Sequence, residues 1–509
     1  MIVIDGQTLS VSALHSVASG EDVVLADSAR KLMDHNAVLA KTPDGASNVL
    51  EQKRDWLLGE HAREIPSDEL ARAFVVGHCA GVGAPLPVEV VRGAIAARAN
   101  VLAAGASGCR PIAAEVLLQM LNQRVHPTVP SQGSVGAAGD LAPMAHIARV
   151  AAGWDDSLRA PGLTPFSPTA KEALALINGV SLTASLAAIA VFRARRVLDT
   201  ATAVCAMTME AVGADANCLD PRALAARGHP TVSEVGRRLR HLLEGSHQVH
   251  QRRKPDAFSI RCAPHVLAAA TEALDHTETI VTRELNGVSD NPLVFEVGQG
   301  VAEQGAAEWI EAGNFHGASL ALAMDHLKVA LTQVATLSER HTFRLTYGQL
   351  TPGLPSFLVA GTGLNSGFMI GQYTAASLAS ECKGLAHPAS VDSVPTVQHH
   401  EDHVSMGPIA ARGAIRIIEC VADIVGIEAL LAAQALDLRK RGLAFDEAGD
   451  PLPAKPIDLA PEIESLHAVV RSRIQFWEDD EVLHPAIAAA GSLIRRGALA
   501  GPERSVGPW

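Results

Sequence analysis

A long run with few charges, from Ile409 to Leu438, limits what this chain can fold into. Its charged residues are Arg412, Arg416, Glu419, Asp423, Glu428 and Asp437. Apolar side chains would therefore surround most of the circumference of a helix formed by this run. Because such a surface is unfavourable in water, we expect the helix to be central in the fold or buried between subunits.

Helical periodicity also marks an earlier stretch of the chain. Leu320, Met324, Leu327, Leu331 and Val334 recur every three or four residues, as on one packed face of a helix. The 509 residues are 48% hydrophobic but only 4% aromatic, and the alanine and leucine content favours helices over strands. We predict a mostly α protein.

The placement of glycine and proline suggests two parts. Residues 1–170 are interrupted often by these residues, which predicts short helices joined by loops. A second cluster of prolines, at 451, 453, 456 and 461, precedes a shorter helical stretch. We expect an N-terminal head in residues 1–170, and a long-helix bundle with a C-terminal helical tail in residues 171–509.

The charge distribution and the cysteines limit which partners and which cellular compartment we expect. The net charge of -13 is spread along the chain, and no basic run could follow a phosphate backbone, so we expect no nucleic acid partner. No apolar stretch of about 20 residues and no leader-like start occurs, which predicts a cytoplasmic protein without a membrane partner. The seven cysteines are scattered singly, as is typical of buried reduced thiols.

A glycine-rich run provides the most specific signal. The run Gly133-Ser-Val-Gly-Ala-Ala-Gly-Asp-Leu-Ala-Pro-Met-Ala-His146 resembles the signature of the histidine/phenylalanine ammonia-lyase superfamily, which includes the aromatic amino acid lyases and aminomutases. The resemblance extends in order to other motifs, among them His78-Cys-Ala-Gly, Asn178-Gly, Val288-Ser-Asp-Asn-Pro-Leu, Gly313-Asn-Phe-His and His387 to Met406. It implies an ammonia-lyase-like fold with a long central helix bundle, and a homotetramer whose active sites are shared between chains.

The resemblance also implies a prosthetic group that this sequence lacks the means to make. In active members an Ala-Ser-Gly tripeptide cyclises and loses two waters to form methylidene-imidazolone, called MIO, whose methylidene is the electrophile. The corresponding residues here are Ala137, Ala138 and Gly139. Because Ala138 has no hydroxyl to lose, we expect no MIO and no other cofactor.

Two family tyrosines are also missing at the matching positions. No tyrosine occurs from Asp44 to Ile65, where the family carries its catalytic base, and Phe258 stands where a second tyrosine is expected. Together with Ala138, these differences indicate an evolved change of chemistry. His61 is a candidate for a replacement base, although a solvated loop residue would look the same.

Several candidate substrate contacts remain. Arg261 matches the arginine that pairs with the substrate carboxylate in the family, and a planar guanidinium suits that task. Asn178 matches a family active-site amide, with a buried backbone cap as the equally plausible alternative. Phe258 and Phe315 would form apolar walls, and Lys383 could bind a carboxylate or be a surface charge.

A histidine-rich cluster near residue 400 holds the remaining candidates. Glu401 matches the family position that faces the substrate amine, and His400 beside it is a candidate substrate contact. The neighbouring histidines could suggest a metal, but their spacing fixes no coordination geometry, so we expect none. His78 is a candidate acid or base, with a hydrogen-bonded core histidine as the alternative.

Three functional hypotheses follow. The first is a MIO-independent lyase, or a conjugate-addition or cyclase enzyme, acting at a Cα–Cβ bond of a carboxylate-bearing or unsaturated acyl molecule. A second is a betaine lyase that removes trimethylamine, resembling ergothionase. The third is a catalytically silent homologue that binds a small molecule or a partner subunit.

Overall fold

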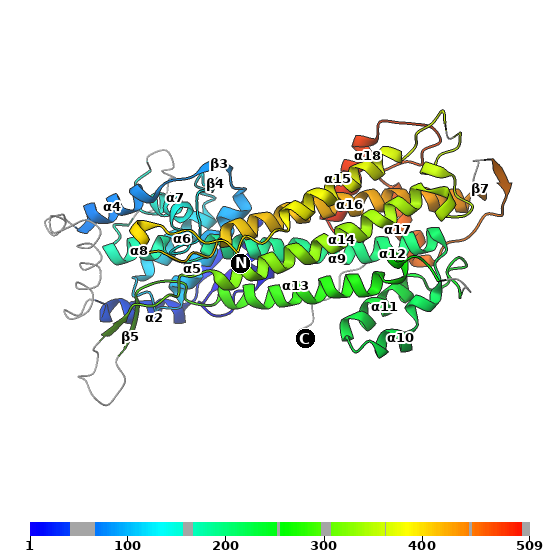
Figure 1. The fold of residues 1–509 in the computed structure, drawn as a ribbon. Helices are drawn as coiled ribbons and strands as arrows, with labels where there is room; N and C mark the ends of the chain where they lie inside the picture. Colours follow the sequence, from blue (N-terminus) through cyan, green and yellow to red (C-terminus); the bar gives the residue numbers. More distant parts are fainter. Residues whose placement is uncertain are drawn as a thin grey trace. The chain divides into compact units, whose positions relative to one another are not determined.

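The computed structural model describes most of the chain and shows a mostly helical protein (Figure 1). The described residues are 1–40, 67–155, 166–251, 255–296, 307–361, 363–446 and 450–500. They form two compact units, each built from separated segments. Unit one comprises Met1–Phe192, Thr277–Asp325 and Pro388–Arg412, and unit two comprises Arg193–His276, His326–His387 and Gly413–Trp509.

Unit one combines short strands with helices of moderate length. Its elements are β1 (Ile2–Ile4), α1 (Val11–Ala18), β2 (Val23–Leu25), α2 (Asp27–Leu39), α4 (Ser67–His78), β3 (Val82–Pro85), α5 (Val88–Ala103), α6 (Pro111–Asn122), β4 (Pro130–Gln132), α7 (Leu141–Ala151), α8 (Ala170–Ile177), β5 (Leu293–Glu296), β6 (Ala307–Ile310) and the 3-10 turn η6 (Val397–His399). β1 pairs with β2 in parallel, whereas β3 pairs with β4 and β5 with β6 antiparallel.

Helix α5 forms the centre of unit one. Ile95 and Leu102 are fully buried, and so is almost every other side chain of the helix. Asn100 on the same helix accepts a hydrogen bond from the Gly6 amide at 2.9 Å and donates to the Leu285 carbonyl at 2.9 Å. The buried amide therefore ties the start of the chain and a distant helix end to one core helix.

Unit two consists mainly of helices. Its elements are η3 (Ala216–Leu219), α10 (Pro221–Ala226), α11 (Pro230–Leu242), α12 (Phe258–Arg261), η4 (Gly348–Leu350), η5 (Ser356–Leu358), α15 (Met369–Leu385), β7 (Leu443–Phe445), β8 (Pro451–Pro453), α17 (Pro461–Arg471) and α18 (Leu483–Arg495). β7 and β8 pair antiparallel. Four longer helices contribute residues to both units: α9 (Ser181–Val212), α13 (Ala263–Leu285), α14 (Ala318–Thr346) and α16 (Gly407–Lys440).

The two helical stretches predicted from the sequence are present. The low-charge run forms α16, in which Ile417, Leu430 and Leu436 are fully buried, so the prediction of a long buried helix is confirmed. The apolar stripe from Leu320 to Val334 lies on α14, and its five members are at most 1% exposed. The mostly α fold is confirmed, while the division at residue 170 stays a prediction, since each compact unit joins separated segments.

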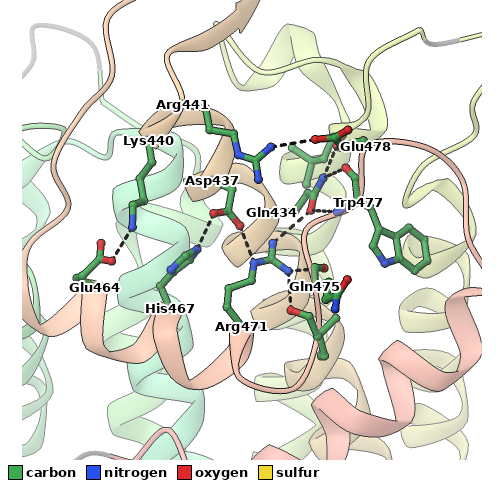
Figure 2. A network of polar contacts seen from close by, with 12 residues as sticks. Gln434, Asp437, Lys440, Arg441, Glu464, His467, Arg471, Gln475, Trp477 and Glu478 are labelled. Carbon is green, nitrogen blue, oxygen red and sulfur yellow. Dashed lines mark hydrogen bonds and ion pairs between the residues drawn. The ribbon is translucent and has the colours of Figure 1, made fainter.

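The end of α16 is attached to α17 by a polar network in unit two (Figure 2). Asp437 accepts from Arg471 Nε at 2.6 Å and lies 3.1 Å from His467 Nε2. Gln434 Nε2 donates to the Trp477 carbonyl at 2.7 Å, and Gln434 Oε1 accepts from Arg471 Nη2 at 3.2 Å. These contacts dock the predicted C-terminal helical tail onto the buried helix.

Two further properties concern the chain as a whole. Within the described ranges, no helix combines the length and apolar character needed to cross a membrane. The seven cysteines are all free, but only Cys109, Cys205 and Cys382 are buried and the other four are partly exposed. The prediction of unpaired thiols is therefore confirmed, and that of general burial is wrong.

Candidate functional site

The glycine-rich run forms a loop that is bonded to the turn after α8. The Gly179 amide donates to the Ala138 carbonyl at 3.0 Å, and the Asp140 amide donates to the Gly179 carbonyl at 2.7 Å. Gly139 and Gly179 thus form an isolated parallel bridge. The backbone of residues 138–140 is held on a second segment rather than exposed as a free loop.

Both glycines of this bridge are required by its geometry. Gly139 has φ +85°, and a Cβ there would lie 2.2 Å from the Gly179 carbonyl oxygen. Gly179 also has φ +85°, and its Cβ would lie 1.7 Å from the Ser289 carbonyl oxygen. Any side chain at either position would meet backbone atoms, so only glycine permits this approach.

Asn178 connects the turn to a buried ion pair. Its side-chain amide, 3% exposed, donates to the Asn291 carbonyl at 3.0 Å and to Asp290 Oδ1 at 3.3 Å. Asp290 Oδ2 in turn accepts from Lys171 Nζ at 2.7 Å, with both side chains buried. The buried cap, one of the two roles considered for Asn178, is therefore present among the described contacts.

Two carboxyl groups of unit one have raised pKa values. Burial raises the pKa of Asp140 to about 6, although its carboxylate accepts from the Thr183 amide and hydroxyl at 2.8 Å each. Burial, with a smaller contribution from the Asp140 charge, raises the pKa of Glu284 to about 7. Unit one thus holds two acids, the buried Asp140 and the partly buried Glu284, that ionise less readily than solvated carboxyls.

Glu401 lies on a segment that packs against the loop. The Thr396 hydroxyl donates to Glu401 Oε2 at 2.6 Å, and the two residues form a β-bridge. Farther along, Val404 and Met406 pack against Ala137, and the Met406 amide donates to the Val135 carbonyl at 2.9 Å. These contacts place the Glu401 segment beside residues 135–137.

Phe315 lies two residues before Gly317, on a further segment that approaches the glycine-rich loop. A Cβ on Gly317 would lie 2.9 Å from Val180 and 3.3 Å from the Ser405 hydroxyl. Ser405 itself donates to the Gly136 carbonyl at 3.2 Å. Three separated segments, around residues 136–139, 178–180 and 405, therefore meet beside the one that carries Phe315.

His78 and His400 differ in their burial and in their surroundings. His78 is the last residue of α4, half-buried, with Nδ1 2.7 Å from the Phe74 carbonyl oxygen. Because a carbonyl can only accept, Nδ1 carries the proton in the neutral ring and Nε2 can accept one. His400 is exposed, and within the described residues no group of three or more metal-ligating side chains forms around it.

The remaining candidates belong to unit two or lie outside the described residues. Arg261 Cζ lies 4.8 Å from the centre of the Phe258 ring, and that ring is 71% exposed. Lys383 is exposed on α15. His61, proposed as a replacement base, is outside the described residues.

Sequence reasoning missed three polar residues that support the loop. Asp140, Asp290 and Lys171 are buried and hold the residues around Gly179 through the contacts given above. Two of them were visible in the motifs, since Asp140 follows the tripeptide and Asp290 lies in Ser-Asp-Asn-Pro. Lys171 carried no signal, because its pairing with Asp290 spans more than a hundred residues.

Comparison with known proteins places this architecture in one class of enzyme. The fold matches a histidine ammonia-lyase structure from Trypanosoma cruzi with a TM-score of 0.84 and 35% identity, over 98% of this chain and 94% of that one. The aromatic amino acid lyase family model matches residues 59–472. The chain belongs to the aromatic amino acid lyase family.

Two individual relatives show which enzymes of this family the chain is similar to. A histidine ammonia-lyase of Anaeromyxobacter dehalogenans is 38% identical over 98% of this chain and 99% of its own length. Another, of Symbiobacterium thermophilum, is 40% identical over 87% of this chain and 86% of its own length. The similarity to histidine ammonia-lyases thus extends well beyond the short motifs.

These relatives overturn the chemistry expected from Ala138. The hypotheses of a MIO-independent lyase, a conjugate-addition or cyclase enzyme, a betaine lyase and a silent homologue are wrong, because histidine ammonia-lyases match nearly the whole chain. The expectation of no cofactor is wrong for the same reason, since the family is MIO-dependent.

The loop meets some of the requirements of the family's prosthetic group. Its backbone is suitable, because residues 138–140 are held by Gly179 and the two glycines permit a tight turn. The side chain is not suitable, because residue 138 is alanine and supplies no hydroxyl. Whether the loop can form the group therefore depends on the assignment of residue 138 to the family's serine position, which stays a prediction from the motif.

Proposed function

We propose that this chain is an amino acid ammonia-lyase that acts on histidine or a close analogue. The observation that carries the proposal is the match to histidine ammonia-lyases at 36–38% identity over nearly the entire chain. The reaction breaks the Cα–N bond, transfers a Cβ proton to a base and forms a Cα–Cβ double bond. The products are ammonia and an unsaturated acid conjugated with the imidazole ring.

We assign the binding of the substrate to residues that match the family's motifs. Arg261 binds the α-carboxylate, for which its forked guanidinium is suited. Glu401, held by Thr396 at one carboxylate oxygen, faces the α-amino group. Phe315 provides an apolar wall for the ring.

We assign His78 as the base that takes the Cβ proton. The Phe74 carbonyl fixes the proton of the neutral ring on Nδ1, so Nε2 is the atom that takes the Cβ proton. His61 remains the second candidate for the base. His400 and Lys383 are exposed and are proposed only as outer contacts to a charged substrate.

The family resemblance supports a homotetramer with shared active sites. An exposed apolar residue on α14 and two on α15, Leu322 at 61%, Ile370 at 50% and Tyr373 at 60%, are consistent with helices that are covered in an oligomer. Sedimentation of the purified protein tests this assembly, and a monomer at working concentration would contradict it.

The activity is tested with purified protein and L-histidine. Ammonia release and the ultraviolet absorption of the conjugated acid are measured for the unchanged chain and for Ala138→Ser. Intact mass spectrometry of both shows whether a mass equal to two waters is lost. The proposal expects ammonia from the unchanged chain. It fails if the unchanged chain releases none, and activity confined to Ala138→Ser would identify the missing hydroxyl as the reason.

His78→Gln tests the base. We expect kcat to fall by about a hundredfold or more, because general base catalysis contributes about 10²–10⁴. His241→Gln, an exposed histidine on α11, is the matched control and should retain full activity. Equal activity in both variants would remove His78 from the mechanism.

A further inference from the structure

A buried histidine in unit two makes hydrogen bonds with both ring nitrogens. His341 on α14 is 1% exposed, with Nδ1 2.7 Å from Glu428 Oε1 and Nε2 2.7 Å from the Ser259 carbonyl oxygen. A carbonyl oxygen can only accept, and so can an ionised carboxylate. With Glu428 ionised, both nitrogens donate, and the ring is an imidazolium paired with Glu428.

Electrostatics agree with this protonation state. Burial alone would lower the pKa of His341, but the charge of Glu428 and the hydrogen bonds outweigh it, and the pKa is raised. Glu428 on α16 also accepts from the Thr208 hydroxyl at 2.7 Å. The pair is thus a fully buried ion pair whose carboxylate is anchored from α9 as well.

The carbonyl that His341 binds belongs to the segment carrying Arg261. Ser259 lies within α12, which has only four residues, Phe258–Arg261. Pro264, the second residue of α13, has no amide hydrogen, so α12 cannot continue into it as one regular helix. A charge-assisted hydrogen bond at Ser259 therefore fixes a short segment that has little helical structure of its own.

We propose that His341 and Glu428 are positioning residues that hold α12 so that Arg261 is preset to bind a substrate carboxylate. The inference deepens the proposed function and rests on its assignment of Arg261. Neither residue touches the substrate. Preset geometry matters because a displacement of about 1 Å in a binding group costs up to about a hundredfold in rate.

The decisive variant replaces both partners, because removing one would leave a buried charge unpaired. His341→Leu with Glu428→Met removes the bond to Ser259 while retaining apolar volume, and such replacements of buried pairs are often neutral for stability. Thr208→Val is the matched control, since it removes a neighbour of Glu428 and leaves the bond to Ser259. Glu428→Gln is the conservative variant, because a neutral His341 can still donate to Ser259 from Nε2.

Binding is measured by calorimetry with imidazolepropionate, which has the carboxylate, and with histamine, which lacks it. The double variant should bind imidazolepropionate about tenfold to a hundredfold more weakly and histamine unchanged. Thr208→Val should bind both ligands as the unchanged chain does. Glu428→Gln, which keeps the bond to Ser259 but loses its charge assistance, should weaken imidazolepropionate binding less than the double variant does. Under turnover the double variant should raise KM for histidine more than it lowers kcat.

Two outcomes would overturn the inference. Unchanged imidazolepropionate binding in a folded double variant would make the pair structural only, and equal weakening of both ligands would point to a general disturbance of unit two. The variant Arg261→Met distinguishes failure of the positioning role from failure of the proposed function. If Arg261→Met leaves imidazolepropionate binding unchanged, the carboxylate role of Arg261 is wrong. If it weakens binding and the double variant does not, only the positioning role is wrong.

Discussion

The amide of Gly179 donates a hydrogen bond to the carbonyl of Ala138 over 3.0 Å, which ties the family's signature loop to the turn after α8. The backbone on which a prosthetic group would be built is therefore supported from outside the loop. Its shape depends on Gly179, Asn178 and the buried pair beneath them more than on the side chain at position 138.

Gly179→Ala should be among the most destabilising single changes in unit one. The added Cβ would lie 1.7 Å from the Ser289 carbonyl oxygen, and the positive φ adds about 1–2 kcal/mol of strain for a non-glycine residue. We expect a loss of more than about 4 kcal/mol in the free energy of unfolding, measured by urea denaturation.

Gly228→Ala provides the matched control for that change. Gly228 has φ +77°, close to that of Gly179, but a Cβ there would meet nothing within 4 Å. We expect a loss of only about 1 kcal/mol from the backbone conformation. Equal losses in the two variants would show that close packing against Ser289 is not the reason for glycine at 179.

Lys171→Met should destabilise the chain because it leaves Asp290 buried without its cation. The two side chains are 7% and 0% exposed, and their charged atoms are 2.7 Å apart. Breaking such a pair costs about 3–5 kcal/mol in the free energy of unfolding. Adding Asp290→Asn to the same variant should restore part of the loss, as measured in a double-mutant cycle. No recovery would mean that Lys171 contributes by packing alone.

Glu284→Gln should change how stability depends on pH. The folded pKa of about 7 lies above the ordinary value of 4.5, because of burial and then the charge of Asp140. A raised pKa favours the folded state below pH 4.5, and this contribution is lost as pH rises through 7. The variant should therefore match the unchanged chain near pH 4.5 and be more stable at pH 8 by on the order of 2 kcal/mol.

The measurement for Glu284 is the denaturation midpoint from pH 4.5 to pH 8. Glu308→Gln, at an exposed position of β6, is the control and should show no such divergence. If Glu284→Gln is equally stable relative to the unchanged chain at both ends of the range, the carboxyl is solvated in the folded protein.

Sequence reasoning captured the features that are local or periodic. The charge spacing between Ile409 and Leu438 predicted α16, because helix burial depends on which faces carry charge. The glycine-rich run predicted a tight loop, and its motif identified the family. Pairings such as Lys171 with Asp290, or His341 with Ser259, join residues far apart in the chain, and no spacing rule predicts them.

The functional error had a different origin. Ala138 changes one side chain in a loop whose backbone depends on other residues, whereas the identity to histidine ammonia-lyases is spread over 98% of the chain. Phe258, predicted as an apolar wall for the substrate, is 71% exposed and lies against Arg261, so its role stays a prediction. A motif assigns residues to positions, but burial and contacts come only from the folded chain.

Asp437→Asn should detach the C-terminal tail from α16. Burial alone would raise the pKa of Asp437, but the nearby His467 ring and the charge of Arg471 outweigh it, and the pKa is lowered. A lowered pKa gives stability that is present above the ordinary value of 3.8 and is lost as pH falls through the folded value. At pH 7 we expect the variant to lose about 3 kcal/mol, because the largely buried Arg471 guanidinium stays in place without its carboxylate partner.

Lys440→Met, on the same helix, is the control for this change. It breaks a more exposed pair with Glu464 and should lose at most about 1 kcal/mol. Limited proteolysis should cut the Asp437→Asn variant between α17 and α18 sooner than the control, and equal rates would place the attachment of the tail elsewhere in unit two.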